Sequence, residues 1–174
     1  FFSLLVLCLI SVVSFSTHVV GSEITYSGLG NNQYFFRVKY WVDCSSSVPI
    51  NSVILRACSC SCSFNNSYTL PVLNPGGTPV FPYCSWPNSV CVSGPDAGIR
   101  EYTFGTTITL GTCPDYIFYS EICCRNGSIT NITNPLSTGM NVRAMLNASL
   151  APNNSAPYIT SLPVGYACCN LANT

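Results

Sequence analysis

A two-residue alternation runs through residues 33–44, QYFFRVKYWVDC. Successive side chains of a β-strand point to opposite faces of a sheet, so this pattern predicts a strand with one apolar face. We expect residues 33–43 to form a central strand with the apolar set directed inward, because the charged residues of the other set are costly to bury unpaired. Trp41 belongs to the outward set and is expected to be a rim or contact residue. The inward set is Tyr34, Phe36, Val38, Tyr40 and Val42, and the outward set is Phe35, Arg37, Lys39, Trp41 and Asp43.

The segments around this strand also carry strand and turn signals. Residues 21–32, GSEITYSGLGNN, predict a short strand that ends in a Gly/Asn turn and forms a hairpin with the next strand. Residues 74–98 are rich in Pro and Gly and predict a long irregular connection. No window of about eleven or more residues combines helical periodicity with helix caps. Further strands or strand pairs are expected in residues 51–63, 99–110, 115–125 and 141–150.

This succession of strands predicts the fold class. Roughly six to eight short strands separated by turn residues are typical of an antiparallel, immunoglobulin-like β-sandwich. We therefore expect an all-β chain with disulfides and a long Pro/Gly-rich connection. The β-sandwich domain is expected to span residues 17–150. Residues 151–174 are expected to form a linker and the first strand of a following β domain.

The first sixteen residues have the features of a signal peptide. Residues 1–16, FFSLLVLCLISVVSFS, are apolar as far as Val13 and end in Ser-Phe-Ser. Small residues at positions 14 and 16 fit a signal cleavage site and predict a mature chain that starts at Thr17. The chain does not begin with Met, so we expect this leader to be truncated at its start. The alternatives are a retained membrane anchor, which needs about 20 apolar residues, and a core strand.

Cysteine is unusually frequent, with twelve cysteines in 174 residues. Such a frequency is typical of exported proteins held by disulfides. A metal site and free thiols are the alternatives, and the cysteines at 58, 60 and 62 would share one face of a strand. However, no second Cys/His group has zinc-finger spacing, and the single histidine is His18. With Cys8 assigned to the leader, the disulfide candidates are Cys44, Cys58, Cys60, Cys62, Cys84, Cys91, Cys113, Cys123, Cys124, Cys168 and Cys169.

Two of these cysteines are adjacent, Cys123 and Cys124. On a strand they would point to opposite faces, so we expect them to bond different partners rather than each other. Cys124 shares a face with the more apolar residues of this strand and is the better candidate for an interior disulfide. Asn126 and Gly127 are expected to turn the chain directly afterwards. The odd total of eleven predicts one thiol that is free or paired outside the chain.

Charge and chemistry exclude several function classes. Six basic residues balance six acidic residues, and only 7% of the chain is charged, so no basic surface is expected for nucleic acid. A catalytic triad would have to use His18, and no carboxylate belongs to a recognisable catalytic motif. We therefore expect a protein that is not an enzyme and has no cofactor or metal. Candidate surface contacts are Trp41, Trp86 and Arg125, although Arg125 is more readily explained as a donor to loop carbonyls.

Several ordered motifs carry a resemblance to a known class of protein. The stretches THVVGSEITYSGLGNNQY, YWVDC, GIREYTF, CCRNGSITNITNP and NNSAPYI occur in this order over nearly all of residues 17–174. This combination resembles the N-terminal region of large cell-surface proteins of gliding Bacteroidota. The sequence departs from that pattern at Ser22, at Val42 and in the cluster of cysteines at 58, 60 and 62. The resemblance implies further immunoglobulin-like or PKD-like repeats and a C-terminal sorting domain that is read by the type IX secretion system.

The expected function combines these observations. We expect a secreted, cell-surface β-sandwich module with a structural or adhesive role, part of a larger gliding-motility-associated surface protein on the extracellular side of the outer membrane. A carbohydrate-binding module of a larger secreted enzyme and a surface filament subunit are the alternatives. The expected partners are other cell-surface components or extracellular polysaccharide. Association with the outer membrane is expected only through parts of the protein downstream of this chain.

Overall fold

The computed structural model describes residues 18–45, 50–80, 91, 94, 98–127 and 129–159. These residues form β-strands and one short 3-10 helix, and none of their helices is long and apolar enough to span a membrane. The expectation of an all-β chain is confirmed. The elements are β1 (Val19–Gly30), β2 (Gln33–Asp43), β3 (Ser52–Ser59), β4 (Phe64–Pro71), β5 (Thr78–Val80), β6 (Ile99–Thr109), β7 (Tyr116–Ile122), η3 (Pro135–Ser137) and β8 (Met140–Leu146).

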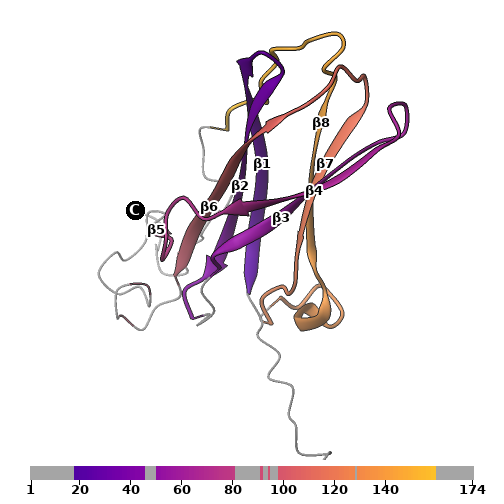
Figure 1. Cartoon of the computed structure of the whole chain (residues 1–174). Helices are drawn as coiled ribbons and strands as arrows, with labels where there is room; N and C mark the ends of the chain where they lie inside the picture. Colours follow the sequence, from indigo (N-terminus) through magenta and orange to yellow (C-terminus); the bar gives the residue numbers. More distant parts are fainter. Residues whose placement is uncertain are drawn as a thin grey trace, which may run out of the picture.

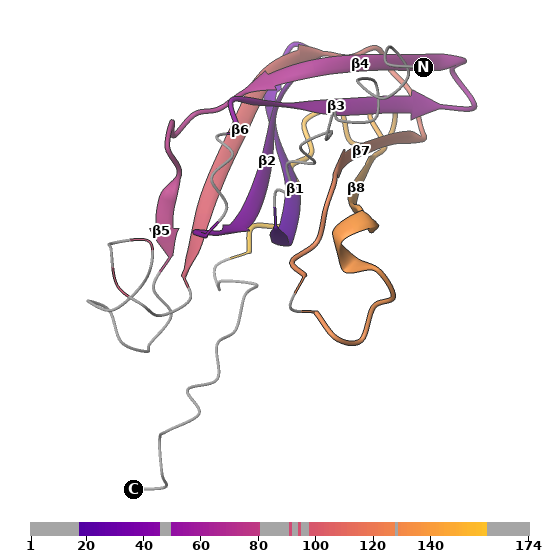
Figure 2. The ribbon, with the colours of Figure 1, turned by 90° about the horizontal axis from the view of Figure 1, so that it is seen from below.

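The strands form two four-stranded antiparallel sheets that pack face to face. Sheet A has the strand order β1-β2-β6-β5, and sheet B has the order β4-β3-β7-β8. Figure 1 shows the β3–β4 hairpin crossing in front of sheet A, and Figure 2 shows the two layers from below. In both views the tip of this hairpin projects beyond the body of the molecule. The predicted antiparallel β-sandwich is therefore confirmed.

The hairpin predicted at the N-terminal end is also present. Asn31 and Asn32 connect β1 to β2 and have φ angles of 51° and 60°, a left-handed conformation that asparagine tolerates better than most residues. Gly30 precedes them with φ of 85°, where a Cβ atom would be strained. β1 has twelve residues and is longer than the short strand that the sequence predicts. The pairing of β1 with β2 then continues to Val19 and Val42.

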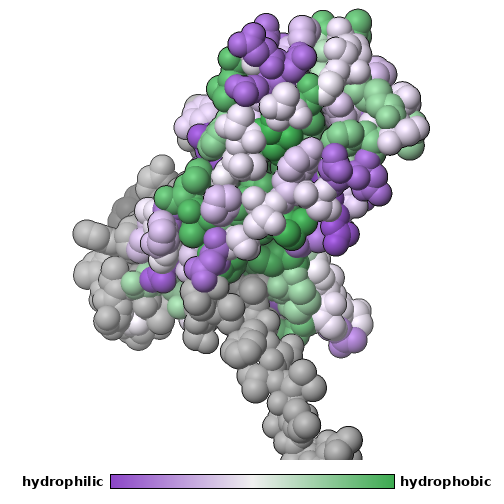
Figure 3. Space-filling view, in the orientation of Figure 1, coloured by the Kyte–Doolittle hydropathy of each residue, from purple (hydrophilic) through white to green (hydrophobic). Residues whose placement is uncertain are grey.

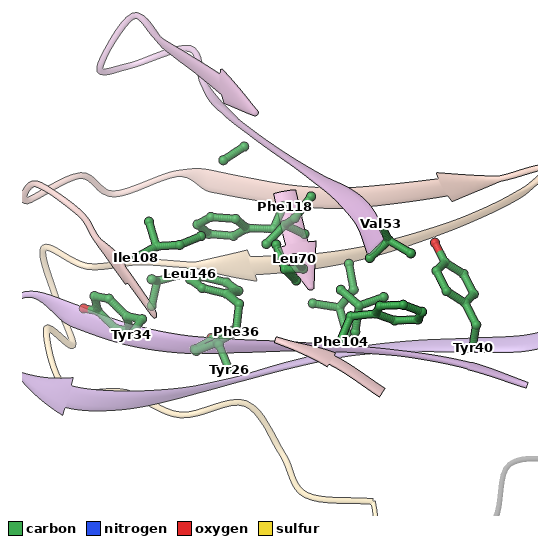
Figure 4. Packing of buried hydrophobic residues seen from close by; sticks show 14 of the residues in the cluster. Tyr26, Tyr34, Phe36, Tyr40, Val53, Leu70, Phe104, Ile108, Phe118 and Leu146 are labelled. Carbon is green, nitrogen blue, oxygen red and sulfur yellow. The ribbon is translucent and has the colours of Figure 1, made fainter. Parts of the chain in front are cut away.

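β2 is a central strand of sheet A, as predicted. β2 lies between β1 and β6, and all five residues of its inward set are at most 2% exposed. The ring centroids of Phe36 and Phe118 lie 4.2 Å apart across the two sheets (Figure 4). The Tyr40 hydroxyl donates a hydrogen bond of 2.9 Å to Ser120 Oγ, which itself donates to the Ile54 carbonyl. Both hydroxyl groups therefore have hydrogen-bond partners in the interior.

Trp41 corrects one prediction about the outer face of β2. Its side chain is 1% exposed, and its Nε1 donates a hydrogen bond of 3.1 Å to Glu101 Oε2. The expectation of a rim or contact residue is therefore wrong. Alternation assigns a residue to a face of the sheet, but it does not say whether that face is covered. The indole nitrogen has a partner, as buried tryptophans require.

Two strands were not predicted as separate elements. β4 pairs with β3 along its whole length, and β5 lies inside the connection that was expected to be irregular. In addition, β3 ends at Ser59, so Cys60 and Cys62 lie in a turn instead of on a strand face. The idea that three thiols share one strand face is therefore wrong. The turn is completed by Ser63, which has φ of 48°.

Residues 151–159 follow the last strand and lie against sheet A. The Ala156 N–H donates a hydrogen bond of 2.8 Å to the Tyr26 carbonyl, and the Gly28 N–H donates one of 3.2 Å to Ser155 Oγ. The Tyr34 hydroxyl donates to the Pro152 carbonyl. These contacts fasten the segment, here named the 151–159 strap, to β1 and β2. The predicted boundaries at residues 16, 150 and 174 remain predictions.

Candidate functional site

Six of the predicted cysteines form disulfides in the described part of the chain. The pairs are Cys44–Cys91, Cys62–Cys113 and Cys123–Cys124. Cys58 and Cys60 are free thiols, and Cys60 is exposed. The remaining disulfide candidates, Cys84, Cys168 and Cys169, lie outside the described residues. Trp86, a candidate surface contact, also lies outside them.

The pairing of Cys123 with Cys124 corrects the sequence-based expectation. β7 ends at Ile122, so the two cysteines follow the strand and are not part of its alternation. The argument that adjacent residues point to opposite faces does not apply there. Cys124 is 7% exposed, which agrees with the expected interior position of its side chain.

Among the described residues, one group of side chains has the spacing of metal ligands. The potential ligand atoms of Cys62, Cys113 and Asp115 lie within 4.8 Å of one another. However, the two sulfur atoms are joined in a disulfide, and zinc needs thiolates. The Asp115 carboxylate instead accepts hydrogen bonds from Ser59 Oγ, the Ser61 N–H and Ser61 Oγ. These bonds hold the turn between β3 and β4, and they lower the pKa of Asp115, with the Ser59 hydroxyl as the largest cause.

Arg125 lies in a loop that closes one end of the sandwich. Its backbone N–H is shared between the carbonyls of Pro135 at 3.1 Å and Thr138 at 3.0 Å, and its Nε donates to the Gly139 carbonyl at 3.4 Å. The bond to Gly139 comes from the guanidinium and the other two from the backbone, so the interpretation of this side chain as a donor to loop carbonyls stays a prediction. Asn126 Nδ2 donates a hydrogen bond of 2.6 Å to Asp43 Oδ2, which connects the loop to the end of β2.

The most developed polar site lies on the outer face of sheet A. A hollow of about 300 Å³ opens over β1, β2 and β6. We name it the polar hollow. Its charged residues are close together because of the strand register, which places Glu23 beside Lys39 and Lys39 beside Thr103. The polar hollow is lined by Glu23, Thr25, Arg37, Lys39, Glu101, Thr103, Tyr158 and Ile159.

Glu101 is the most firmly held side chain in the polar hollow. Its Oε1 lies 3.2 Å from Lys39 Nζ, and this contact is the one ion pair among the described residues. The same oxygen accepts a hydrogen bond of 3.3 Å from Thr103 Oγ1. Its Oε2 accepts from Trp41 Nε1. The amide of Asn74 supports the same stretch of backbone, because it donates to the Glu101 carbonyl at 2.9 Å and accepts from the Thr103 N–H at 2.7 Å. The carboxylate is therefore fixed before any ligand arrives.

Sequence reasoning found only part of this site. The alternation of β2 places Arg37 and Lys39 on the outer face, but Glu23, Glu101 and Tyr158 carry no motif of their own. The register between β2 and β6 brings Glu101 next to Trp41, and a single sequence does not define that register.

Other surfaces of the described residues are less organised. A second hollow of about 380 Å³ lies beside Glu121, Cys123 and Asn141, where Asn141 Nδ2 donates a hydrogen bond of 2.8 Å to Glu121 Oε1. The face with β3 and β4 in front mixes hydrophobic and hydrophilic residues (Figure 3).

Comparison with known proteins does not indicate which of these sites is functional. No protein-family model, no curated protein and no solved structure matches the chain.

Proposed function

We propose that the chain is a secreted, non-enzymatic module with a structural or adhesive role at a bacterial cell surface. The observation that carries the proposal is a disulfide-linked sandwich that presents the fixed polar side chains of the polar hollow on one outer face. Disulfides persist in oxidising compartments, which favours an extracellular location. The resemblance to surface proteins of gliding Bacteroidota favours the same place and a role within a larger gliding-motility-associated protein.

The arrangement of the disulfides also fits a load-bearing role. Cys44 follows β2 and is bonded to Cys91, which precedes β6. Cys62 lies in the β3–β4 turn and is bonded to Cys113, which precedes β7. Each bond connects chain segments about fifty residues apart, with separations of 47 and 51 residues. Neither connection can be pulled apart without breaking a covalent bond.

Adhesion can be tested with beads that carry the exported, oxidised chain. In a flow chamber we expect these beads to attach to surfaces coated with polysaccharide or with protein, whereas beads that carry the reduced and alkylated chain should wash off. Reduction removes the disulfides that hold the outer faces in shape, so the difference reports on the folded surface. Failure of the oxidised beads to attach to any coated surface would contradict an adhesive role.

A carbohydrate-binding module of a larger secreted enzyme is the second candidate. The feature that favours it is Tyr158, which is 81% exposed at the edge of the polar hollow. The sequence of the parent protein beyond this chain distinguishes the two candidates. A catalytic domain there favours the module of an enzyme, whereas tandem β repeats and a sorting domain favour the surface protein.

A further inference from the structure

We propose that the polar hollow binds an uncharged saccharide, so that the adhesive module recognises the neutral part of an extracellular polysaccharide. This inference rests on the proposed function, because it names the ligand class and the site through which adhesion occurs. It is carried by three properties of the site: its balance of charge, its fixed side chains and its exposed aromatic ring.

The balance of charge selects against ionic ligands. Among the described residues, the polar hollow contains two acidic side chains, Glu23 and Glu101, and two basic side chains, Arg37 and Lys39. A phosphate or carboxylate ligand would be attracted by the basic pair and repelled by the acidic pair, and a cationic ligand would meet the reverse. A sugar hydroxyl both donates and accepts hydrogen bonds, as serine and threonine hydroxyls do. A neutral polyhydroxyl ligand can therefore hydrogen-bond to acidic and to basic groups without repulsion from either.

The polar groups are already held in place. Glu101 accepts hydrogen bonds or ion-pair contacts from Lys39, Trp41 and Thr103. The Arg37 guanidinium lies over the Phe35 ring, 5.5 Å from its centroid. These contacts restrict the side chains before binding. Less conformational entropy is then lost when a ligand binds, so less binding free energy is needed to offset that loss. All of the partners lie on strands of sheet A, and rigid elements suit a specific site better than loops.

The apolar edge of the polar hollow complements the C–H face of a sugar ring. Tyr158 is 81% exposed and Ile159 is 49% exposed, and both line the hollow beside the charged residues. An exposed aromatic ring next to fixed polar groups has the mixed composition of small-ligand sites. The volume of about 300 Å³ lies at the lower end of the range for such sites, about 300–1,000 Å³. This size suits a short stretch of a polysaccharide chain that passes across the surface.

Calorimetric titration of the exported, oxidised chain tests the inference with four hexasaccharides. Cellohexaose and mannohexaose are the neutral probes, a galacturonic acid hexamer is the anionic probe, and a glucosamine hexamer is the cationic probe. We expect saturable binding of at least one neutral probe and weaker or no binding of both charged probes. Tyr158→Ala and Glu23→Gln should each weaken that binding about tenfold or more. Glu121→Gln, an exposed carboxylate on the other sheet, is the matched control and should leave binding unchanged.

Three results would overturn the inference: no binding of either neutral probe, tighter binding of a charged probe, or neutral binding that Tyr158→Ala and Glu23→Gln leave intact. Its failure is distinguishable from the failure of the adhesive function. Beads that attach to protein-coated surfaces while the chain binds no neutral probe would keep the proposed function and remove the saccharide site. Saturable binding of a neutral probe by a chain whose beads attach to no surface would keep the saccharide site and remove the adhesive function.

Discussion

At the scale of single residues, neighbours along β2 experience very different surroundings. Val38 is fully buried between the sheets, whereas the side chain of Lys39 is 30% exposed and is paired with Glu101 on the outer face. Substitution at these two adjacent positions therefore separates the contribution of the core from that of a surface ion pair.

We expect Val38→Asp to destabilise the chain by roughly 3 kcal/mol or more, because it buries an unpaired carboxylate in an apolar environment. Lys39→Gln should cost less than about 1 kcal/mol, since partly exposed ion pairs contribute little. Urea denaturation of the two variants measures both values. Equal losses in stability would show that the assignment of faces on β2 is wrong.

Asp115 gives a prediction on pH. Hydrogen bonds from Ser59 and Ser61 lower its pKa in the folded state below the ordinary value of 3.8. The ionised carboxylate therefore stabilises the fold fully above pH 3.8, and this contribution is lost as the pH falls through the lower folded-state pKa. We expect Asp115→Asn to be less stable than wild type at neutral pH and the difference to shrink below pH 3.8. A difference that stays constant between about pH 6 and pH 2 would rule out this role.

The sequence predicted the residues of the β2 core because alternation is a local property. It failed at Trp41, which is 1% exposed although it belongs to the outward set and whose hydrogen-bond partner, Glu101, lies on another strand. It also failed at the cysteine pair after β7, because the end of the strand at Ile122 removed the assumption of alternation. Local patterns therefore could not place a residue whose partner comes from another strand, and they depended on knowing where each strand ends.

At the scale of elements, the Cys62–Cys113 and Cys123–Cys124 disulfides differ in what they connect. The Cys62–Cys113 bond ties the tip of the β3–β4 hairpin to the loop before β7, across 51 residues of sequence. The Cys123–Cys124 bond joins neighbours in the sequence. Because loop length governs the entropy that a cross-link removes from the unfolded chain, the two bonds should contribute unequally.

Replacement of Cys62 and Cys113 by serine should destabilise the chain by about 4 kcal/mol in the chain-entropy model. The matched replacement of Cys123 and Cys124 should cost less, since that bond closes almost no loop. Guanidinium denaturation of both double variants under oxidising conditions measures the difference. A greater loss from the adjacent pair would show that Cys123 and Cys124 hold the fold by another means.

The elements that the sequence missed have weak local signals. β4, FNNSYTLP, contains two asparagines and a serine and ends in proline, residues that favour turns over strands. It becomes a strand because β3 supplies a pairing partner and because Leu70 is buried in the core. β5 has three residues and forms through its pairing with β6. Both are strands by tertiary context, which one sequence does not reveal.

At the scale of the whole molecule, the fold class was predictable and the topology was not. Turn residues between alternating segments were sufficient for a β-sandwich. The order of strands requires pairings such as β2 with β6, in which Gln33 lies opposite Thr109. The same limit applies to the polar hollow, because its residues come from three strands and from the 151–159 strap. The site therefore exists only once the sheet and the strap have assembled.

The last prediction concerns this dependence of the polar hollow on the strap. A Cβ atom at Gly28 would lie 2.6 Å from the Asn153 carbonyl oxygen, closer than real contacts allow. Gly28→Ala should therefore push the strap away from β1 and weaken the hydrogen bond between the Ala156 N–H and the Tyr26 carbonyl. Amide hydrogen exchange at Ala156 should become faster, while exchange in β2 and β6 should change little.

Gly111→Ala is the matched control, because a Cβ atom there would meet only the Tyr116 hydroxyl at 3.7 Å, an ordinary contact. Tyr158 follows Ala156 by two residues, so displacement of the strap should also move the aromatic edge of the polar hollow. The Gly28→Ala variant should then lose affinity for the neutral hexasaccharide that wild type binds, although it keeps all four charged residues of the site. Unchanged exchange at Ala156 in Gly28→Ala, or the same acceleration in Gly111→Ala, would show that the strap is not held by its close approach to Gly28.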